Sequence, residues 1–294
     1  MAAWPTGEVD MARVVFVHGI GAQLSGEPLL TAPWLAALNG GLTRAGADRL
    51  LEHEVAFAFY GDLFRPPGEW LSLDIPYLDA RDVDPGWEQD LLTAWWRHAA
   101  ATDPEVTVPG DESLVAVPSS IQTALYQLAR AKFFAGLGER LLIWNLKQVR
   151  RYFTDSELRE RVRARLRACL APDTRVVVAH SLGSVVAYET LCATTDHPVR
   201  ALLTLGSPLG IPNLVFDRLE PAPVDRLGAW PGPPTLEWSN ISDAGDIVAL
   251  VKDLRPHFGP ALRNALVHNG SHAHDATAYL TDRLTGEVVA RGLL

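Results

Sequence analysis

The residue best suited to covalent chemistry is Ser181, within VVVAHSLGSVVAYETL (residues 176–191). β-Branched residues precede this serine and an amphipathic stretch follows it, so we expect a strand, a tight turn and a helix. The pattern AHSLG at residues 179–183 is G-x-S-x-G with alanine in the first glycine position. Such a turn exposes the serine hydroxyl at the end of a sheet, where it can act as a nucleophile. The alternative is a serine that only caps a helix.

A serine hydroxyl is a weak nucleophile until a base takes its proton, and a histidine oriented by an acid is the usual base. Two candidate acids, Asp243 and Asp246, lie in SDAGDIVAL, after a predicted strand at 235–241. We choose Asp246 because it precedes IVAL, where regular structure resumes. Asp243 can instead cap the turn at Ala244-Gly245, a common role for aspartate.

Three histidines in VHNGSHAHDATAYL are candidates for the base. We place His268 at the end of a strand. His274 stands at the start of the final predicted helix, with Ser271 available as its N-cap, so we choose it over His272. Alternatively, His272, His274 and Asp275 are metal ligands. Zinc needs a further ligand in register, and a metal site leaves the serine unexplained, so we expect no metal.

The attacked carbonyl becomes an oxyanion, which fixed backbone N–H groups must stabilise. Leu182, directly after the nucleophile, offers one such group. We expect the second from Ile20, or alternatively Gly21, in the VHGIG segment at residues 17–21. Each donor is typically worth about 3 to 4 kcal/mol of transition-state stabilisation. The alternative is a glycine turn that only joins a strand to a helix.

These segments resemble the α/β-hydrolase superfamily, especially its bacterial lipase-like and esterase-like members. FVHGIG, VAHSLGSVVAYE, LGSPLG and the regions of Asp246 and His274 carry the resemblance, which spans residues 13–61 and 172–292. FYGDLFRPP and IVALVKDLRP are further marks of a subgroup. The resemblance implies an α/β-hydrolase fold, the chain order serine, acid, histidine, and hydrolysis of carboxylic esters or related acyl bonds. It does not identify the acyl group.

Strands and helices alternate along the sequence, which favours one α/β domain over residues 1–294 with a mainly parallel sheet flanked by helices. We expect strands at 12–21, 53–61, 174–180, 199–208, 235–241 and 263–268. We expect helices at 32–46, 87–101, 119–152, 155–171, 182–194 and from about 274.

Residues 62–152 interrupt this alternation with proline- and glycine-marked loops, so we interpret them as a helical insertion, a lid or cap. Aromatic residues of this segment either line a lipophilic pocket or belong to the ordinary core. They are Trp70, Trp87, Trp95, Trp96, Phe133, Phe134 and Trp144.

Composition and net charge indicate which partners and which cellular compartment to expect. The net charge of -9 opposes binding to nucleic acid, and the basic stretch at 150–167 has apolar residues every four positions. That spacing indicates an amphipathic helix with a solvated basic face. Only Cys169 and Cys192 occur, which favours a reducing compartment over a disulfide framework. The chain shows no leader-like start and no long apolar stretch, so we expect a cytoplasmic location and no stable membrane insertion.

Together these features predict a serine hydrolase that forms an acyl-enzyme on Ser181 and releases it with water. Its partner is a small-molecule acyl substrate, and the oligomeric state is left open. No dinucleotide loop or P-loop pattern occurs, so we expect no cofactor. One alternative is an acyltransferase or thioesterase that acts on a carrier-bound acyl group. Another is a catalytically inactive binding or interaction protein that keeps the hydrolase fold.

Overall fold

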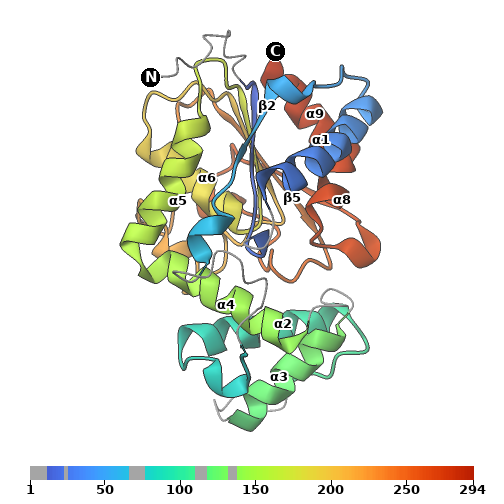
Figure 1. The fold of residues 1–294 in the computed structure, drawn as a ribbon, viewed down its shortest axis with the longest axis vertical. Helices are drawn as coiled ribbons and strands as arrows, with labels where there is room; N and C mark the ends of the chain where they lie inside the picture. The colour runs from blue at the N-terminus through green and yellow to red at the C-terminus, as the bar shows by residue number, and fades with distance from the viewer. Residues whose placement is uncertain (1–11, 23–25, 66–76, 110–117, 132–137) are drawn as a thin grey trace, which may run out of the picture.

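Six parallel strands form the centre of the protein, which is an α/β fold with helices on both faces of the sheet (Figure 1). The structure, a computed structural model, describes residues 12–22, 26–65, 77–109, 118–131 and 138–294. The strands are β1 (Val14–Val17), β2 (Val55–Ala58), β3 (Val176–His180), β4 (Ala201–Leu205), β5 (Glu237–Asp243) and β6 (Arg263–Val267). They lie in the order β2-β1-β3-β4-β5-β6, and every neighbouring pair is parallel. The predicted mainly parallel sheet is confirmed.

The central strands are buried on both faces, which explains their continuous apolar sequences. Every residue of β1, β3 and β4 is buried. Val14 and Phe16 pack among side chains of α1, α8 and α9 on one face of the sheet. Val15 and Val17 point to the other face, where α5 and α6 lie (Figure 1). The alternation follows from the two-residue period of a strand.

The helices differ from the predicted ones mainly at their ends. They are α1 (Glu27–Arg44), α2 (Trp87–Thr102), α3 (Pro118–Arg130), α4 (Glu139–Thr154), α5 (Ser156–Cys169), α6 (Leu182–Ala193), α7 (Arg255–Phe258), α8 (Ala276–Thr281) and α9 (Arg283–Leu293). Short 3₁₀ helices occupy Glu52–Glu54, Gly61–Phe64, Ala80–Asp82, Phe216–Arg218 and Gly270–His272. Helix α1 starts five residues before the predicted start at 32, with Pro28 in its first turn, where proline is well tolerated.

The single helix predicted from about 274 is wrong, because the chain forms α8 and α9 instead. Asp282 between them has extended backbone angles, and its side chain accepts a hydrogen bond from the N–H of Leu284. The predicted cap by Ser271 is also wrong. Asp275 caps α8 by accepting from the N–H of Thr277. Aspartate caps therefore determine both helix starts.

The helical run predicted at 119–152 is divided between α3 and α4, and residues 132–137 lie outside the described part. Helices α2, α3 and α4 pack together at one end of the sheet (Figure 1). Of the aromatic residues singled out in the sequence, Trp70, Phe133 and Phe134 also lie outside the described residues. A single domain over 1–294 and an inserted lid at 62–152 stay predictions.

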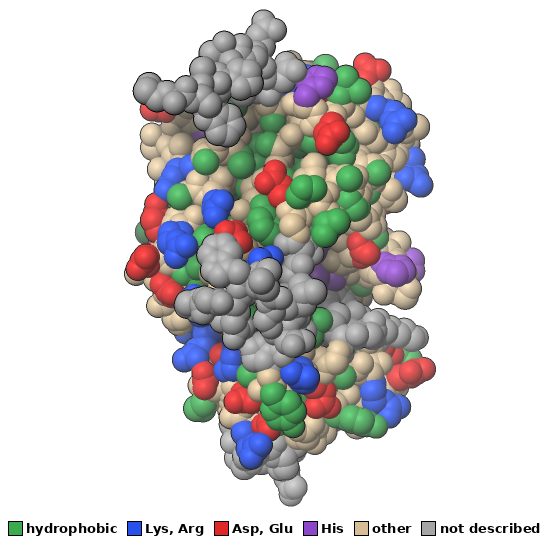
Figure 2. Space-filling view, in the orientation of Figure 1, with side chains coloured by type: hydrophobic (Ala, Val, Ile, Leu, Met, Phe, Trp, Pro, Cys, Tyr) green, Lys and Arg blue, Asp and Glu red, His purple; other side chains and the backbone are tan. Residues whose placement is uncertain are grey.

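The basic face of α5 is only partly solvated, contrary to the prediction. Its apolar side chains Leu158, Val162 and Leu166 are buried as expected. Arg159 is buried as well, because its guanidinium pairs with the fully buried Glu189 of α6. Elsewhere along α5, on the left of Figure 2, basic and acidic side chains are interspersed. An unpaired buried carboxylate would be strongly destabilising, and the ion pair with Glu189 therefore keeps Arg159 buried.

Both cysteines, Cys169 and Cys192, are free. In the ranges that the structure describes, no helix is both long enough and apolar enough to span a bilayer.

Candidate active site

The turn that carries Ser181 has the strained backbone expected of a tight strand–turn–helix connection. Ser181 lies between β3 and α6 with φ 55° and ψ -129°, in the left-handed half of the map. The helix after the turn passes so close to β1 that a Cβ at Gly183 would lie 2.5 Å from the carbonyl oxygen of Val17. A Cβ at Gly19 would lie 2.6 Å from the Ser181 Cβ. Glycine at both positions allows the loop after β1 to lie against the turn at Ser181.

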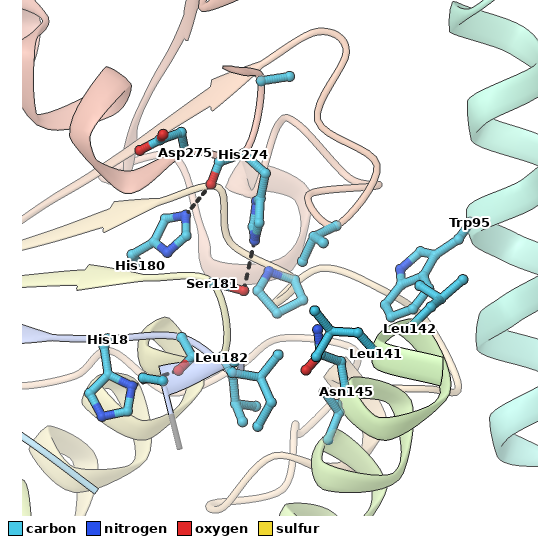
Figure 3. Close-up of a pocket in the computed structure, with 18 of the residues that line it drawn as sticks. His18, Trp95, Leu141, Leu142, Asn145, His180, Ser181, Leu182, His274 and Asp275 are labelled. Carbon is cyan, nitrogen blue, oxygen red and sulfur yellow. Dashed lines mark hydrogen bonds between the residues drawn. The ribbon is translucent and has the colours of Figure 1, made fainter. Parts of the chain in front are cut away.

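Ser181, His274 and Asp246 form a continuous hydrogen-bonded chain. The Ser181 hydroxyl lies 2.9 Å from His274 Nε2, to which it can donate, as Figure 3 shows. On the other side of the ring, Nδ1–H donates to Asp246 Oδ2 at 2.8 Å. The serine follows β3, the aspartate follows β5, and the histidine precedes α8. The structure thus brings together three residues that are far apart in the sequence.

Asp246 is fully buried but ionised. Its Oδ2 also accepts a hydrogen bond from the Tyr279 hydroxyl at 2.8 Å, and its Oδ1 accepts from the N–H of Val248 at 2.9 Å. Burial alone raises the pKa of a carboxyl group, but His274, Lys252 and Tyr279 oppose it and lower the pKa of Asp246 to about 2. The carboxylate can therefore hold the His274 ring in the orientation that leaves Nε2 free to accept a proton.

The alternative acid and the alternative bases have other contacts. Asp243 lies in β5, which extends two residues beyond the predicted strand. Its Oδ1 accepts from the N–H of Gly245 at 2.7 Å, the turn-capping role anticipated for it. The His272 side chain is 69% exposed, and its Nδ1 lies 4.0 Å from Asp275 Oδ2. His268 is exposed after β6. Within the described ranges, no group of three or more His, Cys, Asp or Glu side chains could hold a metal ion.

Ile20 and Leu182 lie on the wall of the same cavity as Ser181. Leu182 is the first residue of α6, so its N–H has no partner within the helix. The aligned peptide dipoles of α6 add positive potential at this end of the helix. Gly21 has φ 93°, which turns the loop away immediately after Ile20. This geometry suits two N–H donors beside the serine, and their role as an oxyanion hole stays a prediction.

His180, directly before Ser181, contacts His274 and was missed as a site residue in the sequence. Its Nε2–H donates to the carbonyl oxygen of His274 at 2.8 Å (Figure 3). The two imidazole rings lie 4.5 Å apart, centroid to centroid. Burial, followed by the nearby His274, lowers the pKa of His180 to about 3. His180 is therefore neutral, and it holds the backbone of His274 in place. Its position next to the serine was the available signal.

His18 supports the loop of Ile20 in a similar way. Its Nδ1–H donates to the carbonyl oxygen of Gly19 at 2.6 Å, and its Nε2 accepts from the N–H of Tyr60 at 3.0 Å. The Tyr60 hydroxyl donates to the carbonyl oxygen of His18. Burial lowers the pKa of His18 to about 4, although its bond to Gly19 opposes this shift. A proton on Nε2 would remove the acceptor that Tyr60 needs.

Because His18 and His180 are buried and neutral, we expect the protein to lose stability in mild acid. In the folded protein the pKa values of His18 and His180 are about 4 and about 3, below the ordinary value of 6.5. At a pH between the folded and the ordinary value, the unfolded chain therefore binds protons that the folded chain does not. The free energy of unfolding should fall as the pH drops below 6.5, by about 2 kcal/mol per histidine at pH 5. Urea midpoints at pH 7.5 and pH 5.0 measure this. His18→Gln should reduce the difference between the two midpoints. His53→Gln, a control at an exposed position, should leave that difference unchanged. Equal midpoints of the wild-type protein at the two pH values would contradict the prediction.

A largely apolar cavity of about 660 Å³ opens in front of Ser181 (Figure 3). Trp95 lines it, which for this residue agrees with the first of the two alternatives left open by the sequence. Trp87 and Trp96 instead donate their indole N–H groups to the backbone at 2.8 Å each, and Trp144 is only partly buried. The aromatic residues are thus divided between cavity wall and core.

No family model, curated protein or solved structure matches this chain. The function of the site must therefore be inferred from its own geometry and chemistry.

Proposed function

We propose that this protein is a serine hydrolase of the α/β-hydrolase superfamily that cleaves carboxylic esters or related acyl bonds. The observation that carries the proposal is the hydrogen-bonded chain from Ser181 through His274 to the ionised Asp246, at the edge of an apolar cavity. A nucleophile, a base and an acid that orients the base are the three parts that acyl transfer through serine requires.

In the proposed reaction, His274 Nε2 takes the hydroxyl proton as the Ser181 oxygen attacks the ester carbonyl. The N–H groups of Ile20 and Leu182 stabilise the resulting oxyanion. His274 then gives its proton to the departing alkoxide, which leaves an acyl-enzyme on Ser181. A water molecule, deprotonated by His274, attacks that ester, and the acid product departs as Ser181 regains its proton. Asp246 stays ionised and stabilises the imidazolium form of His274 throughout.

The arrangement of the sheet supports the same proposal. The nucleophile follows a central strand, the acid follows β5 and the base follows β6, so all three come from the carboxyl ends of parallel strands. Ligands of open parallel sheets bind at this edge. Leu91 and Trp95 of α2 and Leu142 of α4 lie across the cavity from the serine, which supports a lid or cap role for the 62–152 segment.

A fluorophosphonate probe tests the proposal directly, because it phosphonylates only a serine activated by its surroundings. We expect one adduct per chain, on the peptide that contains Ser181, mapped by mass spectrometry. Heat-denatured protein should give no adduct, since unfolding separates the serine from its base. Native protein with no adduct at Ser181 would reject the hydrolase proposal, and an inactive binding protein would then be the better description. Product analysis in the presence of added alcohols distinguishes hydrolysis from acyl transfer.

Asp246→Asn should lower kcat for ester hydrolysis by about 10³- to 10⁴-fold, because an amide cannot hold the His274 ring and its proton as a carboxylate does. Asp243→Asn is the matched control at the neighbouring acid and should cost less than about tenfold. It removes one acceptor from a turn, so its main effect should be a lower unfolding temperature. Equal losses of kcat in both variants would show that Asp246 has no special role.

A further inference from the structure

The described residues that line the cavity in front of Ser181 are mostly apolar. One side of its wall comes from α2 and α4, with Leu91, Trp95, Leu141, Leu142, Val149 and Phe153. The loops after β4 and β5 supply the facing apolar side chains Pro208, Ile211, Val215 and Val248. Among the described residues that line the cavity, none is lysine or arginine.

The basic side chains near the cavity are engaged elsewhere. Lys147 and Arg150 belong to α4, but both pair with Glu88 and Asp84. Lys252 donates to the backbone carbonyl of Asp246. These ion pairs and hydrogen bonds leave the apolar wall without a cation to meet a charged ligand.

Two buried histidines and one acid on the cavity wall, His18, His180 and Asp275, add no positive charge. His18 and His180 are neutral, because burial lowers their pKa values to about 4 and about 3. Asp275 also lines the cavity and is anionic, since hydrogen bonds from Thr277 outweigh burial and lower its pKa. Asp275 therefore gives the described part of the cavity wall a negative charge, whereas the charge of the buried Asp246 is partly balanced by Lys252.

From this distribution of charge we infer the substrate class: the site accepts esters whose acyl group is uncharged and apolar, and it rejects acyl groups that carry a carboxylate. The inference rests on the proposed ester hydrolysis. A hydrocarbon acyl chain gains free energy by leaving water for the Leu, Val and aromatic wall. A carboxylate on the same chain would lose its hydration, find no lysine or arginine among the described lining residues, and meet the negative charge of Asp275.

Asn145 offers a position at which this selectivity can be reversed. It lies on the same face of α4 as Leu141, Leu142 and Val149, and it lines the cavity close to Ser181 (Figure 3). Its Oδ1 is buried without a hydrogen-bond partner, so substitution there breaks no bond of that oxygen. A lysine at this position would place an ammonium group at the apolar wall, and lysine is well tolerated within a helix.

The test compares two esters with the same six-carbon acyl chain, p-nitrophenyl hexanoate and the mono-p-nitrophenyl ester of adipic acid, at pH 7.5. We expect wild-type kcat/KM to favour the hexanoate by about 100-fold or more. Asn145→Lys should lower this ratio at least about tenfold by pairing with the terminal carboxylate. Asn145→Met, with a long uncharged side chain, is the matched control and should leave the ratio within about threefold of wild type.

Several outcomes separate this inference from the proposed function. If fluorophosphonate labels Ser181 but wild type hydrolyses both esters equally well, the inference fails and the hydrolase proposal stands. The inference also fails if Asn145→Lys and Asn145→Met shift the ratio alike, since charge would then be irrelevant. Absence of both labelling and turnover would overturn the hydrolase proposal, and the inference with it. If circular dichroism shows that Asn145→Lys is unfolded, Val149→Lys paired with Val149→Met replaces it.

Discussion

Ser181→Ala is expected to lower kcat for ester hydrolysis by about 10⁵- to 10⁶-fold and to abolish fluorophosphonate labelling. The substitution removes the only atom that can form the acyl-enzyme in the proposed mechanism. Alanine keeps the Cβ, so it adds no new contact with Gly19 in the crowded turn. The folded structure should therefore survive, and the small residual rate should come from substrate binding and the oxyanion donors. Steady-state kinetics with p-nitrophenyl hexanoate, together with thermal unfolding, measures both effects.

Ser184→Ala is the matched control for this loss. Ser184 is fully buried in the first turn of α6, and its hydroxyl donates to the carbonyl oxygen of Ala179 at 3.3 Å. We expect this variant to keep turnover within about threefold of wild type and to lose only a little stability. If Ser181→Ala retained more than about a hundredth of the wild-type rate, the nucleophile would have to be another group.

His274→Ala should lower kcat by about 10⁵-fold or more, because among the described residues no other side chain is placed to take the Ser181 proton. The hydrogen bond from Ser181 to His274 Nε2, at 2.9 Å, is the contact that the variant removes. The variant lacks the general base of the proposed reaction, so the dependence of its residual rate on pH should differ from that of wild type. Rates measured from pH 5.5 to 9 with an uncharged ester report both changes.

His272→Ala provides the comparison, at a histidine two positions earlier in the same loop. Its ring is largely exposed, and its nearest acidic partner, Asp275, is 4.0 Å away. Most of the wild-type rate should remain in this variant. The reverse pattern, with His272→Ala inactive and His274→Ala active, would assign the base to His272 and require the loop to rearrange on substrate binding.

Ser181, Asp246 and His274 were predictable from residue type combined with position relative to a strand, and the fold brings them together. Ser181, Asp246 and His274 each lie in a loop bordering a strand or helix that hydrophobic periodicity predicts well. The choice between Asp243 and Asp246 was harder. Both acids lie near the same strand end, and their hydrogen bonds distinguish them: Asp246 contacts His274, whereas Asp243 accepts from the N–H of Gly245.

Burial and protonation states that depend on residues far away in the sequence could not be predicted from the local sequence pattern. The buried state of Arg159 is explained by Glu189 on another helix, and nothing within the α5 sequence indicates it. The neutral state of His180 follows from its burial beside His274, which lies 94 residues further along the chain. The break at Asp282 was missed because its capping role competes with a helical pattern that continues on both sides.

The backbone at Ser181 also restricts which nucleophiles this scaffold can carry. Its φ of 55° is tolerated by residues with a single substituent on Cβ, but it is highly unfavourable for β-branched residues. The scaffold therefore admits a primary alcohol or a thiol at this position and disfavours a secondary alcohol. By this steric criterion Ser181→Cys is compatible with the turn, whereas Ser181→Thr would require the turn itself to be rebuilt.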